Sequence, residues 1–268
     1  MRPSLTYRDA PARRAGAHCP RRPGRGCHRS ALDRRNSPDT SLARGSSARA
    51  LRVPPGGPAR GVIATRLFLV RHGETDSNRQ GLALDRADVS LNETGRRQAE
   101  LLAVALSSQP MVAVYASPLS RTVDTARPIA SANSLTVEID SRLIEMDVGE
   151  LEGLAFNEVR ERYPGLLETW VSGAGPAHAM PGGERLIDVQ ARVTDAVRSL
   201  AELHSEQAIC AVTHNFVILS LLADILGIDL AGFRRLRHAV AGVTTIEVKN
   251  DRRRILRFND TCHVAPEG

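Results

Sequence analysis

The sequence predicts a three-layer α/β/α sandwich with a mostly parallel central sheet, formed by a single domain that follows a disordered N-terminal tail. Two observations predict this fold. From about residue 65 onward, short apolar runs typical of strands alternate with longer amphipathic segments typical of helices. One run, Ala208–Thr213, is apolar up to its final residue, as in strands that are covered on both faces. Strands that alternate with helices are joined by crossovers, which make neighbouring strands parallel.

Six strands are expected, each a short run rich in apolar residues: Arg66–Val70, Met111–Ala116, Leu135–Ile139, Ala208–Thr213, Val243–Val248 and Ile255–Phe258. The fourth is expected at the centre of the sheet because it is the most apolar. The last two are expected to form a hairpin at the sheet edge, because only a charged turn separates them.

Four helices are expected between the strands, where apolar residues recur at helical spacing: Asn92–Ser107, Leu119–Ala130, Glu184–Ser205 and Phe216–Leu226. The stretch before Glu184, which includes Trp170 and Pro181–Gly183, is expected to be loop-rich. No internal repeat is visible, so residues 61–268 are expected to form one domain.

The overall charge of +6 is the sum of two unlike regions. Residues 1–60 hold 14 Arg and 3 Asp, a net of +11, whereas residues 61–268 hold 22 Lys and Arg and 27 Asp and Glu, a net of −5. The basic isoelectric point therefore describes the tail and does not support nucleic-acid binding by the domain. The tail is rich in Arg, Pro, Gly and Ser, so it cannot bury enough apolar surface to offset its ordering entropy, and we expect disorder.

The tail has no apolar core long enough for a secretory signal or a membrane span. The tail is rich in Arg and Ser and poor in acidic residues, as organellar transit peptides are. The alternative is that the start of the sequence is misassigned and that the natural protein begins near Val53 or Val62. No metal-binding or disulfide spacing links the four cysteines, which are Cys19, Cys27, Cys210 and Cys262. A reducing, cytoplasmic compartment is therefore expected.

Three strand ends carry polar groups. Arg71–Glu74 directly follows the first strand, and its glycine is expected to let the chain turn. Ser117–Arg121 opens a helix after the second strand, and Thr213–Asn215 does so after the central strand. Ligands of open α/β sheets bind outside the carboxyl ends of the strands, so His72 is expected at the binding edge.

These strand ends would together form a cradle for an anion, from two arginines, two histidines and the unpaired N–H groups of helix N-termini. Arg71 and Arg121 carry bidentate donors that match phosphate oxygens, and they stay charged at any working pH. We therefore expect this pocket to bind a phosphoryl group.

Five segments follow one another along the domain: Arg71–Thr75 with Asn78, Ser117–Arg121, Arg142–Gly153 with Glu145, Thr213–His214, and Asn259–His263. In this order they resemble the histidine phosphatase superfamily, the family of cofactor-dependent phosphoglycerate mutases and many phosphomonoesterases. The resemblance covers the chain from about residue 65 to the C-terminus. Each segment alone is a weak signal, whereas four in order are a strong one.

The resemblance implies covalent catalysis in two steps. His72 would become a phosphohistidine, and Glu145 would protonate the leaving alkoxide and then accept a proton from water. Arg71, Arg121 and His214 would hold the phosphoryl oxygens, without a metal or cofactor. Because His72 must be neutral and a protonated His214 is more useful, their pKa values are expected to be pushed apart.

Other polar residues near these segments have less specific roles. Asn78 would donate a further hydrogen bond to phosphate. Asn215 stands where many relatives have glycine, and it would either contact the substrate or cap the following helix. Glu74 is expected to serve the turn rather than the reaction. Surface or loop positions are expected for the remaining histidines without a partner pattern, which are His178, His204 and His238.

Three glutamates are candidates for the acid. Glu150 and Glu152 are alternatives to Glu145, but the spacing before Gly149 favours Glu145.

A competing motif lies in the tail. His18–Arg25 matches the His-Cys-x₅-Arg signature of cysteine-dependent phosphatases, in which consecutive backbone N–H groups bind phosphate. Two of the five loop residues are proline, which has no N–H, and neither a strand nor a helix pattern flanks the motif. We therefore reject Cys19 as the nucleophile.

A phosphatase is the first functional hypothesis, acting on small phosphorylated metabolites with broad specificity or in the manner of α-ribazole phosphatases. Mutases of the family have a longer segment between the acid and the second histidine, whereas here Glu145 and His214 are 69 positions apart. A phosphoglycerate mutase is the second hypothesis, and an inactive phospho-ligand-binding or regulatory protein is the third. The expected partner is a small phosphomonoester rather than nucleic acid or a membrane, and the oligomeric state stays open.

Overall fold

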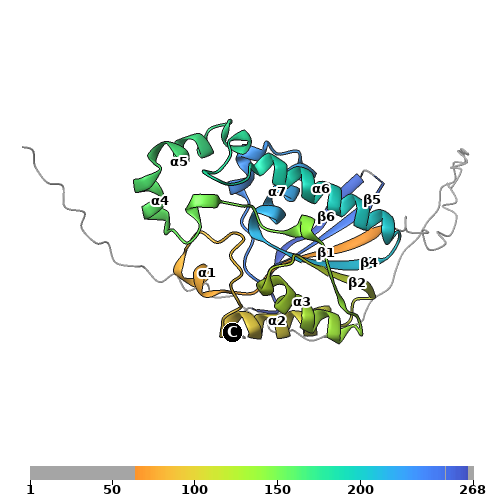
Figure 1. The fold of residues 1–268 in the computed structure, drawn as a ribbon. Coiled ribbons are helices and arrows are strands. Elements are labelled where there is room, and N and C mark those ends of the chain that lie inside the picture. Colours follow the sequence, from red (N-terminus) through yellow and green to blue (C-terminus); the bar gives the residue numbers. More distant parts are fainter. Residues whose placement is uncertain (1–63, 251, 265–268) are drawn as a thin grey trace, which may run out of the picture. The chain divides into compact units, whose positions relative to one another are not determined.

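Six strands form one mixed sheet in the order β3-β2-β4-β1-β5-β6 (Figure 1). The computed structural model describes residues 64–250 and 252–264, so the expectations for residues 1–60, for Cys19 and for the start of the chain lie outside the described residues. The strands are β1 (Thr65–Arg71), β2 (Met111–Ala116), β3 (Val137–Ile139), β4 (Ala208–Thr213), β5 (Val243–Lys249) and β6 (Arg252–Asp260). Strands β3, β2, β4 and β1 are parallel, whereas β5 is antiparallel to β1 and β6 is antiparallel to β5. The mostly parallel sheet and the edge hairpin are thereby confirmed.

Helices cover both faces of this sheet (Figure 1). The α-helices are α1 (Asp76–Gln80), α2 (Glu93–Leu106), α3 (Ser120–Ala132), α4 (Phe156–Arg162), α5 (Pro164–Val171), α6 (Leu186–Leu203) and α7 (Asn215–Leu226). Because side chains alternate along a strand, Phe68 and Val70 of β1 pack with α2 and α3, whereas Leu67 and Leu69 pack with α6 and α7. The expected three layers result.

The predicted strands and helices begin and end within two residues of their predicted bounds, except β6, which begins at Arg252 rather than Ile255. Asn92, predicted as the first residue of a helix, is the N-cap of α2, and its side-chain oxygen accepts a hydrogen bond from the Gly95 N–H at 2.9 Å. The predicted helix from Glu184 begins at Leu186 instead. Short 3₁₀ turns complete the domain: η1 (Ser141–Leu143), η2 (Gly149–Leu151), η3 (Gly175–Ala177) and η4 (Leu230–Arg235).

The loop-rich prediction for the stretch before Glu184 is wrong, because it contains α4 and α5. The Glu158 carboxylate accepts a hydrogen bond from the Ala155 N–H at 2.8 Å and so caps the start of α4. Pro164 is the first residue of α5, where its missing N–H leaves no helical hydrogen bond unmade. Both helices are too short for hydrophobic periodicity to reveal them. The five-residue helix α1 was missed for the same reason.

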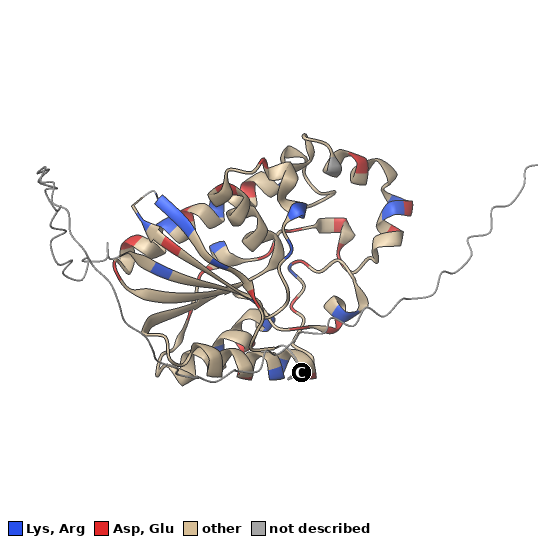
Figure 2. Cartoon of the chain, turned by 180° about the vertical axis from the view of Figure 1, so that it is seen from behind, with Lys and Arg blue, Asp and Glu red and all other residues tan. Residues whose placement is uncertain are grey.

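Lys and Arg segments are interspersed with Asp and Glu segments along the helices, as Figure 2 shows. This mixture agrees with the small net charge of −5 over residues 61–268. Within residues 64–250 and 252–264, every helix is too short or too polar to span a lipid bilayer.

Candidate active site

The carboxyl ends of three neighbouring strands bring the predicted residues together. Arg71 ends β1 and pairs in register with Thr213, which ends β4. The His72 N–H donates to the Thr213 carbonyl at 3.0 Å, and the Ser117 N–H donates to the Val212 carbonyl at 3.1 Å. These backbone bonds fix the three strand ends side by side, as the sequence predicted.

His72 is buried, and only 3% of its surface is exposed. Its Nδ1 lies 2.7 Å from the Gly73 carbonyl oxygen, which can only accept, so Nδ1 carries the proton. Nε2 is therefore the nitrogen with a free lone pair. Burial holds the pKa of His72 well below its usual value, and the positive charges of Arg71 and Arg121 lower it further. The neutral ring is the form that can act as a nucleophile.

Gly73 is required by a close approach rather than by a turn. It is not among the described glycines with positive φ, so the expectation of a glycine-dependent turn is wrong. A Cβ on Gly73 would lie 2.6 Å from the Gly95 carbonyl oxygen, and a Cβ on Gly95 would lie 2.1 Å from the backbone carbonyl oxygen of Glu74. The start of α2 thus packs directly on the nucleophile loop. The Glu74 carboxylate accepts a hydrogen bond from Asn92 at 2.8 Å, as expected for a residue that serves this loop.

Arg71 is held by a residue that the sequence did not single out. Its Nη1 donates to the His238 carbonyl at 2.6 Å, and its Nε has no hydrogen-bond partner among the described residues. His238 is buried, and its Nε2 lies 2.9 Å from the Thr244 hydroxyl of β5. Burial lowers the pKa of His238 to about 4. The expected surface position of His238 is therefore wrong.

His204 was also expected at the surface, but it is half-buried, and its Nε2 lies 2.7 Å from the Tyr115 hydroxyl. His178 is exposed, as expected.

Arg121, in the first turn of α3, is fully buried. Its Nη1 donates to the Ala87 carbonyl at 2.8 Å and its Nη2 to the Asp85 carbonyl, while its Nε has no partner within residues 64–250 and 252–264. The N–H and hydroxyl of Ser120 both bind the Asp88 carboxylate, at 2.7 and 2.8 Å. Asp88 therefore occupies the first backbone N–H of α3, which is not available to a phosphoryl group.

His214 faces His72 across the site. The two ring centroids are 5.2 Å apart, and the planes are inclined at 59°. His214 Nε2 lies 2.8 Å from the Ser117 hydroxyl, whereas its buried Nδ1 has no partner in the described part of the chain. If Ser117 donates to Nε2, Nδ1 carries the proton and points its N–H at no acceptor. Burial, followed by the proximity of His72, holds the pKa of His214 well below its usual value, so the expectation of diverging pKa values is wrong.

Glu145 is the buried acid of the site, with 4% of its surface exposed. Its Oε1 accepts from the Met146 N–H at 2.9 Å, and its Oε2 accepts from the Phe216 N–H at the start of α7, at 3.3 Å. Burial raises its pKa, although these two hydrogen bonds and the nearby arginines oppose the rise. A raised pKa keeps more of the protonated form, which is the form that can donate.

The two alternative acids have other partners. Glu150 is exposed and accepts a hydrogen bond from the Tyr163 hydroxyl at 2.8 Å. Glu152 accepts from the Ala87 N–H at 2.8 Å. Only Glu145, of the three, is fully buried and acts electrostatically on both Arg71 and Arg121.

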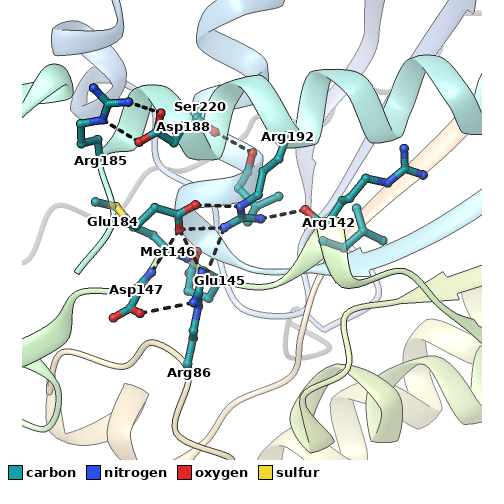
Figure 3. Close-up of polar contacts among 12 residues, drawn as sticks. Arg86, Arg142, Glu145, Met146, Asp147, Glu184, Arg185, Asp188, Arg192 and Ser220 are labelled. Carbon is teal, nitrogen blue, oxygen red and sulfur yellow. Dashed lines mark hydrogen bonds and ion pairs between the residues drawn. The ribbon is translucent and has the colours of Figure 1, made fainter. Parts of the chain in front are cut away.

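A network of charged side chains holds the loop that carries Glu145 (Figure 3). Arg192, on α6, donates from Nη1 to the Arg142 carbonyl at 2.7 Å and from Nη2 to the Glu145 carbonyl at 3.1 Å. Its Nε lies 3.0 Å from Oε1 of Glu184, which also forms an ion pair with Arg86 at 3.3 Å. The sequence offered no signal for this network, because its members are far apart along the chain.

Two predicted substrate-binding residues are not joined to this cluster by any hydrogen bond in the described residues. The side-chain oxygen of Asn78 accepts from the N–H and the hydroxyl of Thr75, at 3.2 and 3.0 Å, and so caps α1. Asn215 is half-buried and is the first residue of α7, with His214 at the N-cap position. The suggestion that Asn215 caps this helix is therefore wrong.

Comparisons with known proteins agree with this geometry. A family model described as the histidine phosphatase superfamily (branch 1) matches residues 67–261. Phosphoserine phosphatase 1 of Hydrogenobacter thermophilus is 35% identical over 199 residues, which are 74% of this chain and 94% of the relative. A metal-independent phosphoserine phosphatase of Arabidopsis thaliana is 31% identical over 206 residues, which are 76% of this chain and 85% of the relative. The solved structure of Bacillus stearothermophilus YhfR matches with a TM-score of 0.71 at 30% identity, and the match covers 75% of this chain and 100% of that one. This chain belongs to the histidine phosphatase superfamily.

Proposed function

We propose that the protein hydrolyses small phosphomonoesters through a phosphohistidine formed on His72. In the first step, His72 Nε2 attacks phosphorus, a P–N bond forms and the P–O bond to the alcohol breaks. Protonated Glu145 gives its proton to the departing oxygen, so the alcohol leaves neutral. In the second step, Glu145 accepts a proton from a water whose oxygen attacks phosphorus. The P–N bond then breaks and inorganic phosphate leaves.

Three buried nitrogen atoms support this assignment and carry the proposal. Nε of Arg71, Nε of Arg121 and Nδ1 of His214 have no hydrogen-bond partner among the described residues. The two guanidinium nitrogens are donors, and Nδ1 of His214 is a third when Ser117 donates to Nε2. An unpaired buried donor costs roughly 1–3 kcal/mol, so this group beside one nucleophile calls for a ligand with several acceptors. A phosphoryl group has three such oxygens, and it gains charge-assisted bonds from the two guanidinium groups.

The low histidine pKa values also support the proposal. A neutral His72 is ready to attack at neutral pH without first losing a proton. A phosphate dianion bound between the rings would raise the pKa of His214 by Coulomb attraction, because an opposite charge favours the protonated form. The substrate itself would then supply the protonated His214 that the clamp needs.

As a superfamily member whose relatives include phosphoserine phosphatases, the chain is a histidine phosphatase that acts on small phosphorylated metabolites. Asn78 and Asn215 remain proposals for substrate binding. Asn78 has an amide nitrogen that makes no hydrogen bond within residues 64–250 and 252–264, so it can still donate to phosphate. The mutase hypothesis differs from the phosphatase hypothesis in what accepts the phosphoryl group from His72, so product analysis separates them.

The test compares His72→Ala with His178→Ala, since His178 is an exposed histidine outside the site. Each protein is incubated without added metal with p-nitrophenyl phosphate and with 3-phosphoglycerate, and free phosphate and 2-phosphoglycerate are measured. We expect phosphate release to fall at least about 10³-fold in His72→Ala, since removing a nucleophile leaves only binding and electrostatics, and to stay within about twofold in His178→Ala. With a substrate whose phosphorus is radiolabelled, an acid-labile phosphoprotein should form in the wild type and in His178→Ala but not in His72→Ala.

Two results would contradict the proposal. Phosphate release that survives in His72→Ala would remove the phosphohistidine. Rapid formation of 2-phosphoglycerate without phosphate release would make the protein a mutase.

A further inference from the structure

An apolar pocket of about 250 Å³ lies between the segment after α1 and the two helices that the sequence did not reveal. Gly81–Leu84 forms one wall, and α4 and α5 contribute Val159, Leu166 and Trp170 to the opposite wall. Figure 1 shows α1 and the pair α4 and α5 on the same side of the sheet. The pocket is therefore separate from the charged network around Arg192 in Figure 3.

Phe216 connects this pocket to the reaction site. Its side chain lines the pocket, while its backbone N–H donates to Oε2 of Glu145 at 3.3 Å. Val148, three positions after Glu145, also lines the pocket. Phe216 thus lines the pocket with its side chain and binds the acid with its backbone, which is the structural link between the pocket and the reaction site.

Trp170, which lines the pocket, packs against two phenylalanine rings, of which Phe216 also lines the pocket and Phe233 lies behind it. Trp170 meets Phe216 edge-on, with ring centroids 6.0 Å apart, and it meets Phe233 in the same way at 5.9 Å. Trp170 is 3% exposed, and its indole N–H has no hydrogen-bond partner among the described residues. The guanidinium of Arg234 lies over the Trp170 ring, 5.7 Å from its centroid. Apart from the guanidinium of Arg234, the side chains that line the pocket are thus apolar or aromatic.

Resting on the phosphatase function proposed above, we propose that this pocket binds the apolar part of the alcohol, so that the preferred substrates are phosphomonoesters of apolar alcohols. Phosphoserine, the substrate in the names of the relatives, carries an ammonium and a carboxylate on its alcohol. Burying these charges against Leu166, Trp170 and Phe216 is unfavourable, because the lining provides neither a carboxylate nor a second cation beyond Arg234 at its edge.

The size of the pocket limits the alcohol. Pockets for drug-sized ligands measure roughly 300–1,000 Å³, so a cavity of about 250 Å³ holds a single ring or a short alkyl chain. Each methylene that enters should improve binding about fourfold, which is the equivalent of roughly 0.8 kcal/mol per buried methylene.

The first experiment measures kcat/KM of the full chain for ethyl, butyl and hexyl phosphate and for phosphoserine. The three alkyl alcohols leave with similar ease, so differences among them report the pocket rather than the chemistry. We expect kcat/KM to rise about fourfold per methylene until the pocket is filled, and phosphoserine to fall below hexyl phosphate. Equal values along the alkyl series, or a preference for phosphoserine, would overturn the proposal while leaving the phosphatase function intact.

A variant that fills the pocket provides a second test. Ala83 lines the pocket, so Ala83→Phe should abolish the gain from ethyl to hexyl phosphate. Val104→Phe is the matched control, since Val104 is 74% exposed on α2, and it should keep the full gain. A chain-length gain that persists in Ala83→Phe would place the alcohol elsewhere and overturn the proposal.

Binding separates this proposal from the proposed function. Ethyl- and hexylphosphonate, which cannot be hydrolysed, are titrated into the wild-type chain by calorimetry. Tighter binding of hexylphosphonate, with no ester hydrolysed, would support the pocket and refute the phosphatase. Equal affinities would refute the pocket, whatever the catalytic result.

Discussion

Replacing Arg192 by alanine tests whether the network in Figure 3 positions Glu145 or only stabilises the fold. The change removes hydrogen bonds to the carbonyls of Arg142 and Glu145, at 2.7 and 3.1 Å, and two to Glu184, at 3.0 and 3.2 Å. The Arg192 side chain is only 18% exposed, so water replaces these bonds incompletely. Bonds to charged groups are worth about 1.5–3 kcal/mol each, and partial rehydration reduces the sum, so we expect unfolding free energy to fall by about 2–4 kcal/mol.

The catalytic effect of the same change should exceed what lost stability explains. Arg192 fixes the backbone on either side of the loop that carries the Glu145 carboxylate, and a misplacement of about 1 Å can cost about 10²-fold in rate. We expect kcat for alkyl phosphates to fall about 10- to 100-fold, with KM changed less than about threefold, because the phosphate clamp is untouched. Arg192→Lys should recover part of kcat, since an ammonium can still reach one carbonyl.

Stability is measured by urea unfolding and activity by initial rates below the unfolding temperature. The control is Arg185→Ala on the same helix region, where the guanidinium binds Asp188 at 2.6 Å but the pair is 51% and 42% exposed. An exposed pair contributes about 0–1 kcal/mol, so this variant should keep both stability and kcat. An Arg192→Ala protein that loses the expected stability but keeps wild-type kcat and KM would refute the positioning role.

Three further predictions follow from the same geometry. Glu145→Gln should slow the first, phosphoryl-transfer step by about 10²–10⁴-fold for alkyl phosphates but much less for p-nitrophenyl phosphate, because nitrophenolate leaves without a proton; first-turnover rates are compared, since both substrates share the second step, and equal losses in the first step would argue against an acid role. Burial lowers the pKa of His238 from 6.5 to about 4, so between these pH values the unfolded chain binds a proton that the folded chain does not. The folded state is therefore at its most stable, as far as His238 is concerned, above pH 6.5, and it loses about 1.4 kcal/mol of unfolding free energy per pH unit as the pH falls toward 4. The lowered pKa values of His72 and His214 also make the folded state less stable as the pH falls, whereas the raised pKa of Glu145 has the opposite effect above pH 4.5. Urea unfolding at several pH values measures the net change of unfolding free energy with pH, and a free energy that does not change with pH would contradict the prediction. Gly95→Ala should unfold at a lower urea concentration, or lose activity because the segment that carries His72 is displaced, since the new Cβ would lie 2.1 Å from the backbone carbonyl oxygen of Glu74. Unchanged stability and kcat would contradict this prediction.

The sheet and the strand-end residues could be predicted because both follow from local patterns. Apolar runs such as Leu67–Val70 and Ala208–Thr213 identify buried strands, and parallel strands bring their carboxyl ends to one edge. Arg71, His72 and His214 lie together for that reason alone. The role of Glu145 as the acid was implied by resemblance, and the spacing before Gly149 favoured it over Glu150, whereas its burial follows only from the fold.

What could not be predicted depends on backbone groups and on contacts between distant segments. The His238 group that binds Arg71 is a carbonyl, which every residue has. Asp88 covers the start of α3 from 32 positions away, and Arg192 reaches Glu145 from 47 positions away. Neither relation leaves a periodicity in the sequence. The required glycine at position 73 was recognised, but for the wrong reason, because its contact with Gly95 is tertiary.

The place of β1 between β4 and β5 has a consequence for how the enzyme is made. Strand β1 is the first element described in the domain, yet its partners Ala208–Thr213 and Val243–Lys249 are made more than 130 residues later. Its two edges cannot both be paired until synthesis has passed residue 249, and Arg71 cannot bind the His238 carbonyl until residue 238 has been made. Such distant pairing slows folding and leaves an apolar strand open to wrong partners meanwhile. The reaction site of a nascent chain therefore cannot be complete before residues 208–249 have been translated, and until then the apolar first strand is exposed to aggregation.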